Sequence, residues 1–155
     1  MSKPVAVLKR LEDSPRTLDR RLVAAYLRSI YRILDPPFDI RIGASPPLDL
    51  KQWLLERSFQ SFAFLTAENP ASRILSKSEN ALRQEVLRTN LLPFLPNDPY
   101  PAIHLSENSD WPAEKSWWAP GLPAEQAVDL GRRFEQNALV FWRQGGEVEL
   151  WWLKE

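Results

Sequence analysis

Polar side chains gather between Thr66 and Ser72, in the segment TAENPAS, directly after an almost continuously apolar run. That run, residues 61–66, has the composition of a buried strand. Open α/β sheets bind ligands just beyond the carboxyl ends of such strands. Asn69-Pro70 is also an ordinary turn sequence, and the Asn69 amide could bond its own backbone. The segment is therefore either part of a ligand site or a plain turn.

A second polar group follows at the start of a predicted helix. Ser76 and Glu79 have the spacing of a capping box, which by itself accounts for Glu79. Glu79 is otherwise a candidate general acid or base. Asn80, in the first helical turn, can aim its amide at whatever the adjacent loop holds.

Two later segments offer groups for the same site. Glu114 and Ser116, in WPAEKS, add a carboxylate and a hydroxyl. Gln136 and Asn137 fall where a predicted helix meets a strand, and helix capping is the alternative explanation for them. The one histidine, His104, lies in a predicted strand, and we expect a structural or surface role for it.

The sequence lacks the standard signatures of cofactor and metal chemistry. It has no cysteine, which excludes disulfides, thiolate nucleophiles and cysteine metal sites. Glycine-rich phosphate loops, dinucleotide fingerprints and paired-histidine motifs are also missing from it. We therefore expect no cofactor and no metal.

Charge and hydropathy constrain the partners. Twenty Lys and Arg residues balance twenty Asp and Glu residues, so nucleic-acid binding is disfavoured. The apolar run from Val5 to Leu8 is too short for a signal-peptide core, and no segment approaches the ~20 apolar residues of a membrane span. We expect a cytoplasmic protein without a membrane segment, whose partner is a small molecule or another protein.

Helical and strand periodicities divide the chain into alternating elements. In the first half of the chain, these periodicities predict a helix from Ser14-Pro15 to Leu34, a strand over 38–42, a short helix over 48–57 and the strand at 61–66. The second half predicts a helix from about 77 to 92, a strand over 102–105, a loop and then a strand within 111–118, and a helix from Pro123 to about 137. A hairpin over 138–143 and 147–153 turns at Gly145-Gly146.

This order predicts an α/β fold, with α+β as the alternative: a mixed β-sheet flanked by helices, with a C-terminal β-hairpin. At 155 residues the chain fits one domain, which we place at 16–155, after an extension over 1–15 that could be flexible. Strand alternation puts Trp151 and Trp152 on opposite faces, so one of them is expected to meet solvent, a helix or a partner.

Several of these segments together resemble a bacterial family, the domain of unknown function 3293. The resemblance rests on Tyr26 and Tyr31, Ile42-Gly43, the FLTAENP core with Ser72, and Glu79-Asn80, followed by Trp111, Glu114, Ser116 and the FEQNA segment at 134–138. The chain departs from the family pattern at Glu68, where an aromatic residue is more common, and at Glu135, where glycine is common. The polar positions that match the family motifs are Thr66, Asn69, Ser72, Asn80, Glu114, Ser116 and Gln136.

Three functions remain open. The first is binding of a small ligand or nucleotide-like metabolite at the loop and helix start from Thr66 to Asn80, where neutral amides and hydroxyls cluster. The second is a protein-interaction or regulatory domain that uses the aromatic C-terminal hairpin. The third is a hydrolase or transferase that uses Glu79 or Glu114 as acid or base. The sequence does not determine the oligomeric state.

Overall fold

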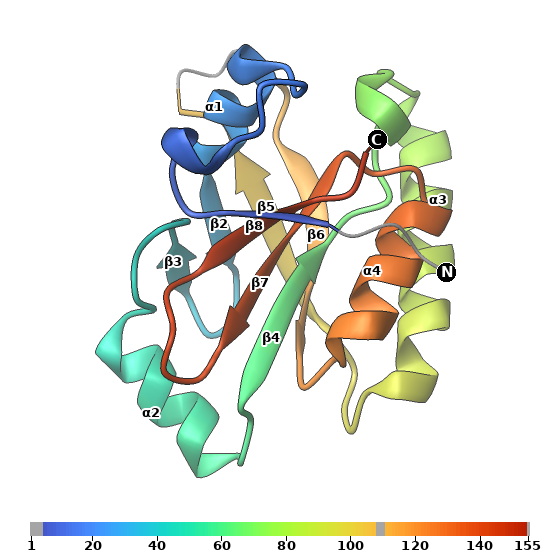
Figure 1. Ribbon diagram of the computed structural model, residues 1–155. Coiled ribbons are helices and arrows are strands. Elements are labelled where there is room, and N and C mark those ends of the chain that lie inside the picture. Colours follow the sequence, from blue (N-terminus) through green and yellow to red (C-terminus); the bar gives the residue numbers. More distant parts are fainter. Residues whose placement is uncertain (1–4, 108–110, 155) are drawn as a thin grey trace.

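One eight-stranded sheet organises the molecule (Figure 1). The computed structural model describes residues 5–107 and 111–154. The strands lie in the order β1-β8-β7-β4-β6-β5-β2-β3, and each of these neighbouring pairs is antiparallel. Their bounds are β1 (Ala6–Leu8), β2 (Ile30–Ile33), β3 (Phe38–Ile40), β4 (Ser61–Leu65), β5 (Tyr100–Leu105), β6 (Glu114–Pro120), β7 (Ala138–Arg143) and β8 (Glu149–Trp152).

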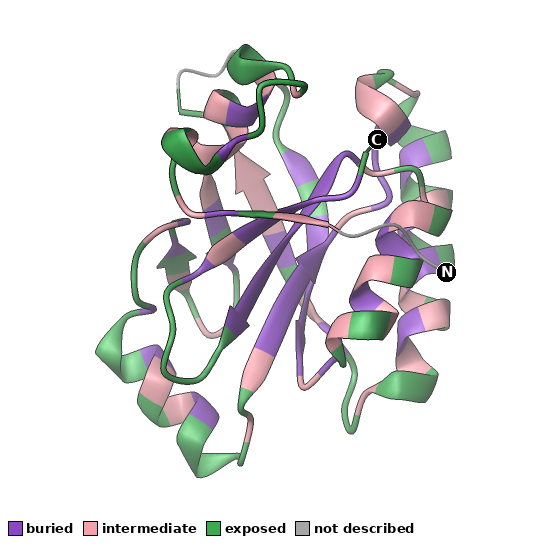
Figure 2. Cartoon of the chain, viewed as in Figure 1, coloured by how far each residue is buried: buried purple, intermediate pink, exposed green. Residues whose placement is uncertain are grey.

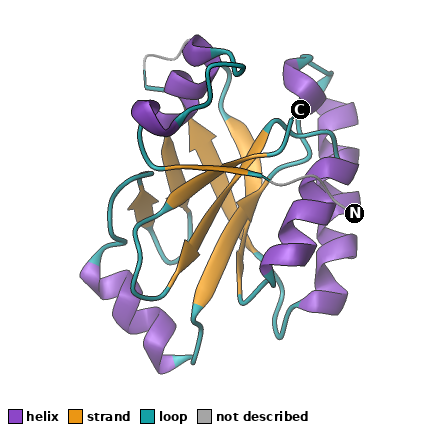
Figure 3. Cartoon of the chain, in the orientation of Figure 1, coloured by secondary structure: helices purple, strands orange, loops and turns teal. Residues whose placement is uncertain are grey.

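The four α-helices of the described residues flank this sheet in two pairs (Figure 3). Residues of α1 (Arg20–Arg28) and α2 (Leu48–Glu56) pack in one apolar cluster, and residues of α3 (Lys77–Leu91) and α4 (Ala124–Arg133) pack in another. Short 3-10 turns lie at Leu11–Asp13, Pro70–Ser72 and Leu92–Phe94. The predicted helix-flanked sheet with a C-terminal hairpin is confirmed, in its α+β form.

The central strand β4 contributes to both clusters. Phe62 and Phe64 pack with the α1 and α2 side chains, whereas Ala63 and Leu65 pack with the α3 and α4 side chains. Because side chains alternate along a strand, a strand covered on both faces needs an unbroken apolar sequence. Figure 2 shows the middle strands β4 and β7 coloured as buried over most of their length.

The C-terminal hairpin is buried on both faces. Trp152 lies edge-on to Tyr26 with ring centroids 5.5 Å apart, and Trp151 stacks on Phe141 at 4.3 Å. The exposed fractions of Trp151 and Trp152 are only 6% and 4%. Both tryptophans therefore pack within the chain, and neither offers an exposed contact surface.

The hairpin turn is wider than the sequence predicts. A bond from Gly146 N to Arg143 O closes a turn whose central residues are Gln144 and Gly145, one position before the predicted Gly145-Gly146, and the ladder between β7 and β8 starts only at Glu149. The Val148 backbone instead pairs with Gly43 and Ala44. The expected strand start at residue 147 was wrong because Val148 satisfies its backbone groups against another loop.

The first predicted helix is too long at both ends. Asp19, rather than Ser14, caps α1, and the helix stops before Ser29. Residues 30–33 form strand β2, in which buried Tyr31 and Ile33 alternate with exposed Arg32. Isoleucine and tyrosine suit a strand, and pairing with β3 and β5 overrides a periodicity that also fitted a helix.

The N-terminal segment contributes a strand to the sheet. β1 pairs with β8, and Leu8 is fully buried. The division into an extension over 1–15 and a domain over 16–155 stays a prediction, although β1 lies in the same sheet as the rest. Across residues 5–107 and 111–154, no helix combines the length and the apolar character that a membrane span requires.

Antiparallel pairing gathers several strand ends at one end of the sheet. The last residue of β4, Leu65, pairs with Trp117 in the middle of β6, so the loop that follows Leu65 runs toward the start of β6, and the end of β4 also lies close to the start of β7. The end of β5 lies beside the starts of β6 and β2. Polar segments that follow or precede these ends are therefore neighbours in space. This antiparallel arrangement, and not the carboxyl edge of an open α/β sheet, brings the 66–72 loop next to Glu114 and Gln136.

Candidate functional site

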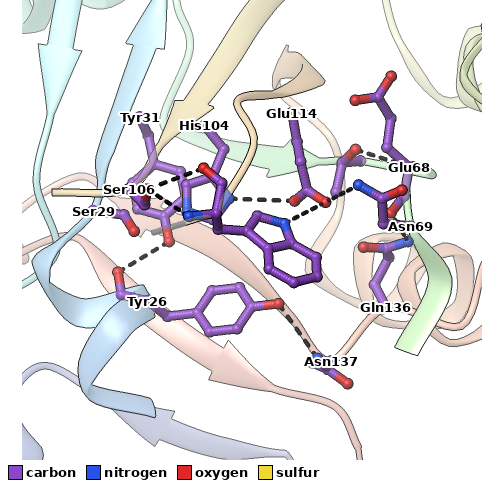
Figure 4. A network of polar contacts seen from close by, with 12 residues as sticks. Tyr26, Ser29, Tyr31, Glu68, Asn69, His104, Ser106, Glu114, Gln136 and Asn137 are labelled. Atoms are coloured by element: carbon purple, nitrogen blue, oxygen red, sulfur yellow. Dashed lines mark hydrogen bonds and ion pairs between the residues drawn. The ribbon is translucent and has the colours of Figure 1, made fainter. Parts of the chain in front are cut away.

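A cavity of about 210 Å³ opens at this end of the sheet. Its walls come from α1, from the loop after β4, from the ends of β5 and β6 and from the junction between α4 and β7. The lining residues are Leu22, Ala25, Tyr26, Ser29, Asn69, Ser72, His104, Ser106, Trp111, Glu114, Gln136 and Asn137. Figure 4 shows several of their polar groups turned toward one another. We refer to this space as the cavity.

Glu114, at the start of β6, lies at the centre of the polar contacts. Its Oε2 accepts hydrogen bonds from Asn69 Nδ2 at 2.7 Å and from Trp111 Nε1 at 3.0 Å. Its Oε1 lies 3.6 Å from His104 Nδ1 on the neighbouring strand. With 7% of its side chain exposed, this carboxylate is held in place by donors rather than by bulk water.

His104 is enclosed by aromatic rings. It stacks against Tyr31 with ring centroids 4.8 Å apart and against Tyr26 at 5.6 Å. Its Nε2 is buried without a hydrogen-bond partner among the described residues. The expected structural role of His104 agrees with this packing, but the ring also forms part of the cavity wall.

The two tyrosines near His104 are neutral hydrogen-bonding groups. Burial raises the pKa of Tyr26 to about 12 and that of Tyr31 well above its usual value. The Tyr31 hydroxyl donates to the Tyr26 carbonyl oxygen at 3.1 Å, and the Tyr26 hydroxyl lies 3.5 Å from Asn137 Nδ2. Both phenols therefore keep their protons across the physiological range.

Asn69 adopts a left-handed conformation that its amide stabilises. Its φ is 47°, and its Oδ1 accepts from Asn80 Nδ2 at 2.9 Å and from Leu75 N at 3.0 Å. The Asn69 N–H in turn donates to Asn80 Oδ1 at 2.9 Å. The alternative of a plain turn that bonds its own backbone does not describe this residue, whose amide reaches Glu114, 45 positions along the chain.

Two further residues of the loop share the unusual backbone. Ala71 and Ser72 have φ values of 52° and 62°, in a region that side chains other than glycine rarely adopt. The Ala71 N–H donates to the carbonyl oxygen of Glu135, whose own φ is 59°. Glycine, common in the family at the Glu135 position, would suit that backbone. Such strain persists only where neighbouring contacts enforce it.

Arg83 connects the loop after β4 to the end of α4 by hydrogen bonds, and the sequence did not identify it as a site residue. Its Nε donates to the Ala67 carbonyl oxygen at 2.7 Å, and its Nη2 donates to the Phe134 carbonyl oxygen at 2.6 Å. Ala67 lies two residues after the end of β4, and Phe134 directly follows α4. Nothing in the local sequence indicates this role, because both partners are backbone atoms distant along the chain.

The seven predicted site residues converge, although not all reach the cavity. Asn69, Ser72, Glu114 and Gln136 line it. A smaller inner void of about 30 Å³ shares Glu114 and Gln136 with the cavity, and Thr66 and Ser116 line that void. Asn80 lies behind Asn69, facing a separate outer groove of about 530 Å³. Ligand contact by these seven residues stays a prediction.

Thr66 and Ser116, two of these seven residues, differ in whether their hydroxyls have hydrogen-bond partners. Thr66 Oγ1 donates to the Lys115 carbonyl oxygen at 2.6 Å and accepts from Glu68 N at 3.1 Å. Ser116 is 5% exposed, and its Oγ has no partner among the described residues. Thr66 therefore serves the backbone, whereas Ser116 presents an unsatisfied hydroxyl.

The two carboxylates considered for acid–base chemistry, Glu79 and Glu114, differ in their exposure and location. Glu79 is exposed and caps α3, where its Oε1 accepts from Ser76 Oγ at 2.8 Å, and this bond lowers its pKa. Glu114 is buried in the cavity wall. The capping-box interpretation of Glu79 is confirmed, and only Glu114 is placed where it could act on a bound molecule.

The fold and site thus define an α+β protein with a cavity at one end of an antiparallel sheet, into whose wall several polar side chains project. Residues 65–139 match the family described as "Protein of unknown function (DUF3293)", which confirms the resemblance found in the sequence. The match runs from the end of β4 to the start of β7 and contains all seven predicted site residues. No curated protein and no solved structure matches the chain.

Proposed function

We propose that this protein binds a small organic ligand in the cavity. The observation that carries the proposal is the buried Glu114 carboxylate, oriented toward one space by Asn69 and Trp111. Small-molecule sites are mostly apolar concavities with a few fixed polar groups, and this cavity has that composition. Its volume of about 210 Å³ lies below that of typical drug-sized sites, which favours a compact metabolite.

Backbone strain in the adjoining loop supports the same proposal. Three residues within the stretch 69–72 hold left-handed backbone angles. A fold tolerates such strain where it positions a side chain, and strained residues cluster at binding and active sites. Here the strained loop presents Asn69 and Ser72 to the cavity.

The lining chemistry argues against phosphorylated ligands. Among the described residues that line the cavity, none is Lys or Arg, and Glu114 contributes a carboxylate. A phosphate would meet this buried carboxylate without a lysine or arginine to compensate it, which is unfavourable. Of the nucleotide-like metabolites considered from the sequence, a nucleobase or nucleoside therefore fits better than a nucleotide.

A thermal-shift screen against nucleobases, nucleosides, nucleotides, amino acids and small amines tests the proposal. A ligand at about 100 times its dissociation constant stabilises the folded state by roughly 2.7 kcal/mol, which is several degrees for a chain of this size. We expect a shift with at least one uncharged or cationic compound and none with the matched phosphates.

Two substitutions to leucine distinguish ligand binding in the cavity from binding in the outer groove. Ala25→Leu adds side-chain volume to the cavity wall on α1 without removing a hydrogen-bonding side chain. Ala81→Leu makes the same change on α3 beside the outer groove. Loss of the shift in Ala25→Leu alone supports the cavity. Loss in Ala81→Leu alone, or no shift with any compound, would overturn the proposal.

A second candidate function is favoured by the contact between His104 and Glu114. A carboxylate beside an imidazole in a cavity wall is a common arrangement for proton transfer, so an enzyme that uses Glu114 as acid or base is the alternative. Turnover of nitrophenyl esters, phosphates or glycosides that is abolished in Glu114→Gln, in protein that remains folded, would favour the enzyme.

The aromatic hairpin gives less support to a protein-interaction role. Phe141, Trp142, Trp151 and Trp152 are all buried within the chain. A partner that used these side chains would have to open the core. The interaction hypothesis stays a prediction, but it lacks the exposed aromatic surface that motivated it.

A further inference from the structure

We infer that the ligand presents hydrogen-bond donors on a flat, amino-bearing group, such as an amidine or an amino-substituted heteroaromatic ring. This inference rests on the proposed function and narrows it to a chemical class. It follows from three features of the cavity: a carboxylate oxygen with spare acceptor capacity, an unpaired amide oxygen, and aromatic walls in which no described residue is Lys or Arg.

The spare acceptor is Glu114 Oε1. The other oxygen of this carboxylate already accepts from Asn69 and Trp111. Among the described residues, the one polar contact of Oε1 is His104 Nδ1 at 3.6 Å, which is longer than a hydrogen bond. A donor on the ligand can therefore bond Oε1 without displacing either existing partner.

The unpaired amide oxygen is Asn137 Oδ1. Asn137 is 2% exposed, and its Nδ2 donates to Ser72 Oγ at 2.8 Å, whereas Oδ1 has no partner among the described residues. Asn137 lines the same cavity as Glu114. A buried acceptor left unpaired costs free energy, so an N–H or O–H donor gains by reaching it.

Aromatic rings complete the walls. The Tyr26 ring, whose hydroxyl stays protonated, and the Trp111 ring both line the cavity. Aromatic faces attract planar and positively charged groups. Because no described lining residue is Lys or Arg, these walls hold no ammonium or guanidinium group that would offset the charge of an anionic ligand.

Three ring compounds of nearly equal size and shape test this class: benzamidine, benzamide and benzoate. They differ in the number of donors and in charge, from cation through neutral amide to anion. Dissociation constants are measured by ligand-observed NMR titration of the intact protein. We expect benzamidine to bind at least about tenfold more tightly than benzoate, with benzamide between them, because a bond to a charged partner contributes that much or more.

Two variants identify the acceptors. Glu114→Gln should reduce the preference for benzamidine over benzamide at least about threefold, because the carboxylate that favours a cation is gone. Glu107→Gln, an exposed residue paired with Arg28, is the matched control and should leave the order unchanged. Asn137→Asp keeps an acceptor and removes a donor, so it should retain or strengthen benzamidine binding.

The failures of the two proposals are distinguishable. Benzoate binding as tightly as benzamidine, at a site blocked by Ala25→Leu, would overturn the donor-rich class while leaving the cavity as a ligand site. Loss of benzamidine binding in Asn137→Asp, in folded protein, would show that Asn137 supplies a donor and would also overturn the class. A screen in which no compound stabilises the protein would contradict the proposed function itself.

Discussion

Asn69 Nδ2 donates a 2.7 Å hydrogen bond to Glu114 Oε2, joining the loop after β4 to the first residue of β6. Both side chains are buried, with exposed fractions of 7% and 6%. The same amide also satisfies Asn80 and Leu75. The position of the cavity carboxylate therefore depends on a loop whose backbone is held in an unusual conformation.

Removal of the Asn69 amide should destabilise the fold strongly. Asn69→Ala leaves the Asn80 amide and the Leu75 N–H without their acceptor and removes one of the two donors to Glu114 Oε2. We expect a loss of about 3 kcal/mol in the free energy of unfolding. Urea unfolding measures it. Asn90→Ala, which truncates an amide on the surface of α3, is the control and should change stability by less than about 1 kcal/mol. Equal losses in the two variants would contradict the account of the loop.

Glu68 should make stability depend on pH in the direction opposite to most carboxylates. Burial, reinforced by the nearby Glu114, raises the pKa of Glu68 above its usual 4.5, although a bond from Lys115 N opposes the shift. A carboxyl with a raised pKa in the folded state contributes most below the unfolded pKa, and that contribution is lost as pH rises through the folded pKa. The melting temperature of Glu68→Gln minus that of wild type should therefore be larger at pH 7 than at pH 4.

Asp39 provides a control of the opposite sign. The bond from Arg32 lowers the pKa of Asp39 below its usual 3.8. Its contribution is present above the unfolded pKa and disappears as pH falls through the folded pKa. Asp39→Asn should thus lose stability relative to wild type at pH 7 and approach wild type near pH 3. If thermal melts gave both variants the same pH trend, the interpretation of Glu68 would be wrong.

Two buried serines should respond differently to truncation. Ser116 Oγ has no partner among the described residues, so Ser116→Ala should leave the free energy of unfolding unchanged or raise it by up to about 1 kcal/mol. Ser29 Oγ donates to the Ala25 carbonyl oxygen at 2.7 Å, so Ser29→Ala should cost about 1 kcal/mol. Chemical denaturation compares them, and a clear loss in Ser116→Ala would show that its hydroxyl has a structural partner.

Local signals in the sequence predicted the elements that depend on neighbours along the chain. The capping box at Ser76 and Glu79 and the apolar run at 61–65 were both identified correctly, because each is specified by adjacent residues. Tyr31 was placed in a helix because its pairing with β3 and β5 is non-local. Helical spacing and strand alternation overlap in short apolar segments, and tertiary pairing decided between them.

The candidate site was predictable only in part for the same reason. The polar positions around Asn69 could be named from composition and family resemblance, but the bond to Glu114 depends on strand register across the sheet. His104 and Glu114 are cross-strand neighbours, a relationship that spacing does not reveal. Asn137 was explained as a helix terminator, which concealed its place in the cavity wall.

The most direct test of the central claim follows the indole N–H of Trp111, which donates to Glu114 at the cavity. In a ¹H–¹⁵N spectrum, comparison with Trp111→Phe assigns its resonance. The indole of Trp142, which bonds the Gly146 carbonyl oxygen in the hairpin turn, is the internal reference. During titration with benzamidine we expect the Trp111 resonance to shift saturably while that of Trp142 stays fixed. If a compound stabilises the protein but leaves the Trp111 resonance unmoved, that result would contradict ligand binding in the cavity.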